Sequence, residues 1–192
     1  ARIRSSLRER AADHRLTLED MQDTQSDATS LLAVELLGML EGAWAKVPVD
    51  DAFIPYRDRP ELDALVAMLA AWDRRMTREQ AAPVAFEAFM YFLTRDILAD
   101  DMGLFFEPVL GQEPLYCIKF ALLALRDPQS PLLQGGRDAL VLGSLDEAAA
   151  FLTTRFGSTS SGFLWKDFHV TAFPSESIAA FEALTAKYPE DR

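Results

Sequence analysis

Three carboxylates near the start of the chain are spaced so that they could bind a cation. Asp20, Asp23 and Asp27 lie at positions i, i+3 and i+7 of an expected helix and would therefore share one of its faces. Carboxylate oxygens are the ligands that a hard cation such as calcium prefers. A solvated acidic face explains the same spacing and is favoured, because negative charge is stabilised near a helix N-terminus. Their role stays open.

Serine–histidine–aspartate chemistry would need one of the two histidines as its base. His14 lies in a polar break between expected helices, where a solvated or capping role accounts for it. His169 lies among aromatic residues, and a packed ring with one satisfied nitrogen is favoured over a general base. An enzyme built around His169 and an unidentified acid is kept as one hypothesis, and the role of His169 is open.

Candidate nucleophiles lack the surroundings that catalysis requires. Cys117 is the single cysteine and lies in the apolar stretch 115–125, so it is interpreted as a buried, inert thiol. Residues 157–162 contain four hydroxyl side chains but no Gly-x-Ser-x-Gly turn between a strand and a helix, and are interpreted as a plain loop. The sequence predicts no catalytic, cofactor-binding or metal-binding residue in this chain.

Charge and hydropathy exclude several classes of partner. Thirty acidic and nineteen basic residues give a formal net charge of −11, which repels nucleic acid and anionic membrane surfaces. No apolar run approaches the 18 or so residues of a membrane span. Apolar residues make up 49% of the chain and include 13 phenylalanines, enough to form a core.

Most of the segments that must position these side chains show the periodicity of an α-helix. Apolar residues recur near a 3.6-residue period in several segments, with capping boxes at Thr17, Thr77 and Ser144 and a terminating Gly103. Ile3, Leu7 and Ala11 recur at near-helical spacing before a break around residues 13–15. Further expected helices cover residues 18–44 as one long helix, then 60–72, 77–100, 114–125, 144–156 and a last helix after Ser175. Expected loops cover 47–58, 127–136 and 157–162.

These elements predict a mainly α fold, an irregular multi-helix assembly with long loops. Residues 163–173 are rich in aromatic side chains and are expected to be extended or irregular. Residues 1–126 would form a helical core segment and residues 137–192 a smaller mixed helical segment. The opening Ala1-Arg2-Ile3-Arg4 is typical of a helix interior, so we expect one compact unit cut from a longer protein.

Several motifs together resemble a known family. Their order along the chain matches the penicillin-acylase-type amidohydrolases, and the resemblance extends over most of the chain, with little added by residues 103–161. The motifs are Arg2-Ile3, Glu19-Asp20-Met21, Gln25-x-Asp27-x-x-Ser30-x-x-Ala33, Leu69-x-x-Trp72-Asp73, the helix from Ala82 to Asp100, and Trp165-Lys166-Asp167-Phe168-His169 followed by Phe173-Pro174.

The resemblance implies an N-terminal-nucleophile hydrolase. In this family, autocatalytic cleavage frees a serine whose hydroxyl attacks a linear amide and whose own α-amino group acts as base. The acyl groups removed come from β-lactam antibiotics or N-acyl homoserine lactones. The serine, the oxyanion hole and the usual calcium ligands lie upstream of the Arg2-Ile3 segment. Residue 1 here is Ala, so no catalytic residue is carried over onto this chain.

Two functions from different classes follow. The leading hypothesis is a structural helical part of the acylase β chain, inactive alone, whose partners are the α chain and the rest of the β chain. It would be periplasmic or extracellular by resemblance, with calcium only in the parent enzyme. The alternative is a stand-alone helical protein-binding module with an exposed apolar groove. In either case exposed apolar surface would favour self-association.

Overall fold

The computed structural model describes residues 2–168, and this part of the chain is mainly α, as predicted. Within it the backbone forms no strand, and Thr29 and Arg75 make one isolated bridge. No described helix is long and apolar enough to cross a membrane. The elements in order are α1 (Arg2–Asp13), α2 (Leu18–Gln25), α3 (Leu31–Trp44), η1 (Asp51–Tyr56), α4 (Pro60–Ala71), α5 (Ala82–Met102), η2 (Gly103–Phe105), α6 (Phe106–Gln112), α7 (Pro114–Arg126), α8 (Arg137–Phe156) and α9 (Trp165–Phe168).

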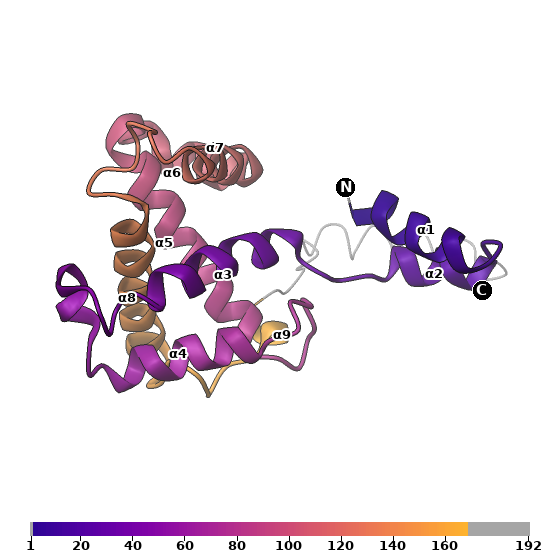
Figure 1. Ribbon diagram of the computed structural model, residues 1–192, viewed down its shortest axis with the longest axis horizontal. Coiled ribbons are helices and arrows are strands. Elements are labelled where there is room, and N and C mark those ends of the chain that lie inside the picture. The colour runs from indigo at the N-terminus through magenta and orange to yellow at the C-terminus, as the bar shows by residue number, and fades with distance from the viewer. Residues whose placement is uncertain (1, 169–192) are drawn as a thin grey trace, which may run out of the picture.

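Helices α5 and α8 form the centre of the body, and α3, α4 and α7 pack around them (Figure 1). The apolar face predicted for α5 is buried, with Phe86 and Phe89 at 1% and 0% exposure. Leu142, Leu145 and Leu152 of α8 are fully buried as well. Each such side chain contributes about 1.5–3 kcal/mol when it leaves water, so this pair of helices supplies much of the stability.

The prediction of one long helix over residues 18–44 is wrong. The segment forms two helices, α2 and α3, separated by residues 26–30. Asp27 Oδ1 accepts hydrogen bonds from the backbone N–H and hydroxyl of Thr29, and the Ser30 hydroxyl caps α3 by accepting from the Ala33 N–H. Side chains of Asp and Ser compete in this way with helical backbone bonds, and apolar periodicity alone does not detect the break.

Two helix starts also differ from the prediction. Helix α5 begins at Ala82 rather than at Thr77, with Pro83 in its first turn, where a proline suits the backbone. Helix α8 begins at Arg137, directly after Gly136, whose φ of 94° requires glycine. Ser144 therefore lies inside α8 and caps nothing.

Of the segment 163–173, which was expected to be extended or irregular, residues 163–164 are irregular as predicted, but the next four residues are helical. Trp165–Phe168 form the short helix α9. The remaining residues of that expectation, 169–173, and the last helix expected after Ser175 lie outside the described residues.

Helices α1 and α2 form a pair beside the body (Figure 1). The predicted capping box is confirmed, with the Thr17 hydroxyl accepting from the Asp20 N–H and the Asp20 carboxylate accepting from the Thr17 N–H. Among the side chains described in this pair, only Ser6, Asp20 and Thr24 are buried, and all three are polar. The pair is therefore joined by polar contacts rather than by an apolar core.

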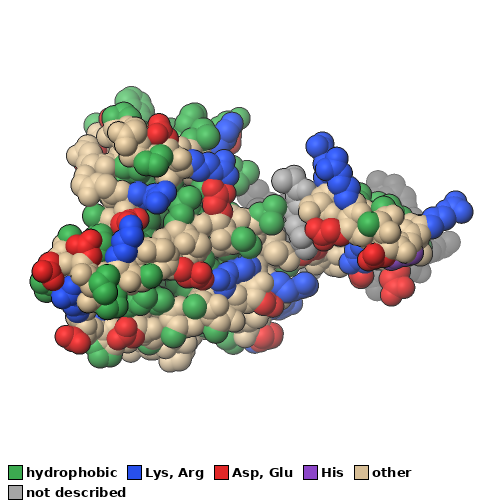
Figure 2. Space-filling view, in the orientation of Figure 1, with side chains coloured by type: hydrophobic (Ala, Val, Ile, Leu, Met, Phe, Trp, Pro, Cys, Tyr) green, Lys and Arg blue, Asp and Glu red, His purple; other side chains and the backbone are tan. Residues whose placement is uncertain are grey.

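Helix α7 has apolar side chains on two opposite faces. Cys117, Ala121 and Leu125 are buried on the side of α5. Tyr116 and Phe120, on the other face, are 56% and 55% exposed. Other apolar side chains, Leu104, Phe105, Leu115 and Leu123, are exposed nearby, and Figure 2 shows hydrophobic side chains reaching the surface at this end of the molecule. We call Tyr116, Phe120 and Leu123 the outer α7 face.

Candidate functional site

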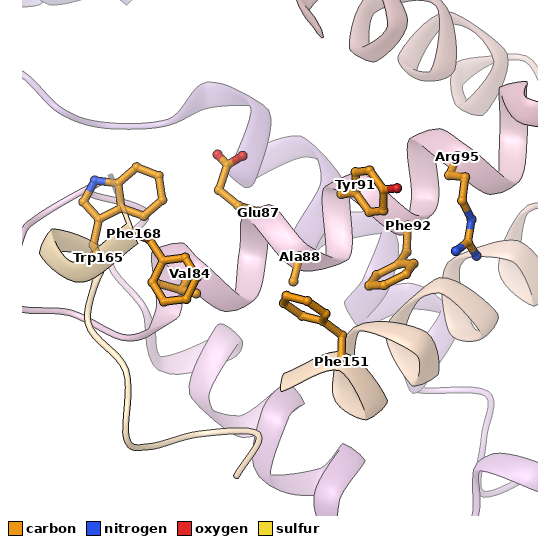
Figure 3. Close-up of a pocket in the computed structure, with 9 residues that line it drawn as sticks. All are labelled: Val84, Glu87, Ala88, Tyr91, Phe92, Arg95, Phe151, Trp165 and Phe168. Carbon is orange, nitrogen blue, oxygen red and sulfur yellow. The ribbon is translucent and has the colours of Figure 1, made fainter. Parts of the chain in front are cut away.

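A groove of about 550 Å³ runs along one face of α5 and is lined mainly by apolar side chains. Helix α5 supplies one wall with side chains at helical spacing, α8 supplies a phenylalanine, and α9 supplies two aromatic rings (Figure 3). A concave, largely apolar surface with few polar groups is the usual form of a small-molecule site. The lining residues are Val84, Glu87, Ala88, Tyr91, Phe92, Arg95, Phe151, Trp165 and Phe168.

The α9 wall of the groove is fixed to the loop that precedes α5. The Trp165 backbone N–H donates to the Gln80 carbonyl at 2.9 Å, and the Lys166 N–H donates to the Arg78 carbonyl at 3.1 Å. The Lys166 ammonium pairs with Glu79, and the Phe168 ring makes an edge contact with Phe156 of α8. These contacts hold the aromatic rings of α9 in place before any ligand arrives.

Of the described residues that line the groove, two are charged, and their surroundings differ. Arg95 pairs with Asp96 of its own helix and with Glu147 of α8, so its charge is already offset. Glu87 is half-buried and has no hydrogen-bond or ion-pair partner among the described residues. Burial raises the pKa of the Glu87 carboxyl, because an apolar environment disfavours the charged form.

The three carboxylates predicted to share a helix face do not do so. Asp20 and Asp23 lie on α2, and both accept from Arg10 of α1, at 2.9 and 3.1 Å. Asp27 lies in the linker after α2. His14 Nε2 also lies 2.9 Å from Asp20. Bonds from the Thr17 backbone N–H and hydroxyl, together with those from His14 and Arg10, hold the pKa of Asp20 well below its usual range.

This arrangement does not suit calcium. Asp20 and Asp23 point their oxygens at a guanidinium, which supplies the positive charge that a cation would bring. Residues 2–168 contain no group of three or more His, Cys, Asp or Glu side chains placed to hold a metal ion. The calcium implied by the family resemblance thus has no ligand set on the described residues.

The candidate nucleophiles are engaged in structural contacts. Cys117 is buried, and burial raises the pKa of its thiol, which favours the unreactive protonated form. In the loop 157–162, the Ser161 hydroxyl donates to that of Ser158, and the Thr159 hydroxyl donates to the Glu61 carbonyl. His169 lies outside the described residues.

Sequence reasoning included an exposed apolar groove in the alternative function but did not locate it, and it missed one buried polar pair. The Ser144 hydroxyl, interpreted as a helix cap, is fully buried and donates to Asp96 Oδ2 at 2.7 Å, joining α8 to α5. The groove had a detectable signal, since Val84, Ala88 and Tyr91 mark a second face of the helix beside the core face. The partners from α8 and α9 are distant in sequence and have no such signal.

The segments that carry the family resemblance meet at residues 73–81, the loop between α4 and α5. From the first segment, the Ser30 N–H donates to the Arg74 carbonyl at 2.8 Å. From the second, the buried Trp72 donates its indole N–H to the Arg75 carbonyl and the Gln80 side chain. Trp165 of the last segment bonds to Gln80 as described above. Motif residues as far apart in sequence as Ser30 and Trp165 thus bond to the same loop.

Comparison with known proteins agrees with this resemblance. A family model described as penicillin amidase matches residues 1–188, which is nearly the whole chain. Searches of curated proteins and of solved structures found no match. Because the family match extends over the α1–α2 pair, the body and the segments that meet at the α4–α5 loop, the chain belongs to the penicillin amidase family.

Proposed function

We propose that this chain is a helical supporting section of a penicillin-amidase-type amidohydrolase and is inactive alone. The parent enzyme would hydrolyse linear amides, removing acyl groups from β-lactams or N-acyl homoserine lactones. Its nucleophile would be an N-terminal serine outside these 192 residues, supplied with the remainder of the α and β chains. The family match over residues 1–188 is the observation that carries this proposal.

The contacts of the family motifs support a structural role. Ser30, Trp72 and Trp165 direct their polar groups at the backbone or side chains of the α4–α5 loop, and none of these contacts pairs a nucleophile with a base. The Trp72 ring also packs in a tilted arrangement against Phe86 in the core, with 5.7 Å between the ring centroids. Residues with these contacts position helices, which is what a section that walls an active site would need.

The outer α7 face supports the proposal that other parts of the enzyme cover this section. Monomers rarely expose large contiguous apolar patches, and such patches mark protein–protein contacts. Tyr116, Phe120 and Leu123 recur at i, i+4 and i+7, the spacing of a helix face that packs against a partner. In the parent enzyme this face would lie against the remaining β chain or the α chain.

An amidase assay tests the proposal. Purified chain is incubated with chromogenic phenylacetyl and long-acyl anilides, with an intact penicillin acylase as the positive control. We expect no turnover above buffer. Turnover that survives further purification, or a substrate analogue bound covalently to any side chain of this polypeptide, would contradict an inactive supporting section.

The outer α7 face allows a second test. We expect Phe120→Glu to reduce binding of a hydrophobic dye and self-association in sedimentation experiments several-fold, with unchanged helical circular dichroism. Gln112→Glu, at an exposed polar position of α6, is the control and should leave both unchanged. Wild-type chain that stays monomeric and binds no dye would contradict an uncovered interface.

The stand-alone binding module stays as the second candidate, because the groove along α5 is an exposed apolar surface of the expected kind. Complementation distinguishes the two functions. Co-expression with a penicillin acylase lacking the corresponding section should restore amidase activity if the chain is a section of such an enzyme. A folded chain that restores nothing would favour the module.

A further inference from the structure

The groove along α5 contains a carboxylate, Glu87, that has no cationic partner among residues 2–168, and aromatic rings line the same groove. Glu87 lies on the same face of α5 as Val84 and Tyr91, three and four residues away (Figure 3). Trp165 and Phe168 of α9 line the same groove, and Phe168 leaves 42% of its surface exposed. A carboxylate that is half removed from water and lacks a partner among the described residues is costly to retain, unless a ligand pairs with it.

We propose that this groove binds an organic ammonium with an apolar body, and that Glu87 pairs with its cationic head. This inference does not depend on the proposed function. A protonated amine would donate charge-assisted hydrogen bonds to Glu87, while neighbouring aromatic faces attract positive charge. The alkyl or aromatic body of the ligand would lie along Phe92 and Phe151.

The charges at the groove select against an anionic ligand. Arg95 is the one cationic side chain among the described residues that line the groove. It already pairs with Asp96 and Glu147, and its guanidinium lies over the Phe92 ring, 4.8 Å from the centroid. It is therefore less available to a carboxylate than Glu87 is to an amine. The net charge of −11 also favours cations in the vicinity.

The volume of about 550 Å³ fits a small molecule. The backbone bonds that fix α9 to the α4–α5 loop keep the rings of Trp165 and Phe168 in position, so binding requires little reordering of the protein. A folded protein partner would need a much larger contact area, so a small amine and the protein-binding module are alternative occupants of this groove, and these features favour the amine.

The test compares three probes of one length, 1-heptylamine, 1-heptanol and heptanoate, with the full chain at neutral pH. Binding is followed by calorimetry and by NMR signals of the groove residues. We expect the amine to bind at least about tenfold more tightly than heptanol, which corresponds to about 1.4 kcal/mol, and heptanoate to bind weakest.

Two variants assign the effect to the groove. Glu87→Gln keeps the side-chain shape and should remove the preference for the amine, while heptanol binding is retained. Glu113→Gln removes one exposed carboxylate elsewhere and should change nothing. Equal affinities for the amine and heptanoate, or an amine affinity unchanged in Glu87→Gln, would overturn the proposal. Circular dichroism of both variants verifies that they are folded.

Discussion

The buried bond between Ser144 and Asp96 gives a prediction whose size follows from its geometry. Ser144 is fully buried in α8, and its hydroxyl donates to Asp96 Oδ2 at 2.7 Å. A hydrogen bond to a charged group contributes roughly 1.5–3 kcal/mol. The side chain of Asp96 is 18% exposed, so water can partly replace the hydroxyl and the lower end applies. Alanine recovers about 0.5 kcal/mol through its higher helix propensity.

Ser144→Ala should therefore reduce the free energy of unfolding by about 1 kcal/mol. With a urea dependence of about 2 kcal/mol per molar, the unfolding midpoint should fall by about 0.5 M. The matched control is Ser5→Ala, which removes an exposed bond from Ser5 to Glu9 on α1 and should shift stability by less than about 0.5 kcal/mol.

A glycine variant distinguishes the two roles considered for Ser144, a position inside α8 and the helix N-cap that the sequence predicts. Inside α8, Ser144→Gly should be less stable than Ser144→Ala by about 1 kcal/mol, because glycine disfavours a helix interior. At a helix N-cap the order reverses, since glycine is tolerated there better than alanine. A reversed order, or equal effects of Ser144→Ala and Ser5→Ala, would refute the reasoning.

Three further predictions address the core, the α1–α2 pair and the groove. Phe89→Ala, at a fully buried position, should cost about 3–5 kcal/mol in thermal unfolding, whereas Phe105→Ala, 72% exposed, should cost under about 0.5 kcal/mol. Thr17→Ala should reduce the stability of α2, measured by amide hydrogen exchange, by about 1 kcal/mol. Because folding lowers the pKa of Asp20, this carboxylate contributes to the free energy of unfolding above its unfolded pKa of about 3.9. That contribution is lost as the pH falls toward the folded pKa. The raised pKa of Glu87 has the opposite effect, so stability is lost as the pH rises from the unfolded pKa of about 4.3 through the folded pKa. Glu87→Gln should therefore make the free energy of unfolding less dependent on pH in this range.

Sequence reasoning predicted the helical class and the start of α4 and α7, because prolines 60 and 114 mark first turns regardless of tertiary context. It failed where one residue type has two uses. The Ser144 motif matches a capping box, yet its hydroxyl bonds across to another helix. Asp27 fits a helix face, yet its carboxylate holds a turn. Periodicity carries no information on which use prevails.

The candidate site was less predictable than the fold. The groove brings Glu87 together with Phe151 and Trp165, which are 64 and 78 residues further along the chain. Its α9 wall is held beside α5 by the backbone bonds of Trp165 and Lys166 to the loop before α5, a pairing that no local pattern encodes. The family motifs include Trp165, but they indicate only the family resemblance and not a groove.

The polar junction between α1 and α2 has a consequence for ionic strength. Arg10 pairs with Asp20 and Asp23 across this junction, and none of the buried side chains that the structure describes there is apolar. Salt screens the exposed Arg10–Asp23 pair, and to a lesser extent the pair with the buried Asp20, but it strengthens apolar packing when the anion is sulfate. Added sulfate should thus destabilise the α1–α2 pair while it stabilises the body. The difference between the melting temperatures of these two parts of the chain would therefore increase with the salt concentration.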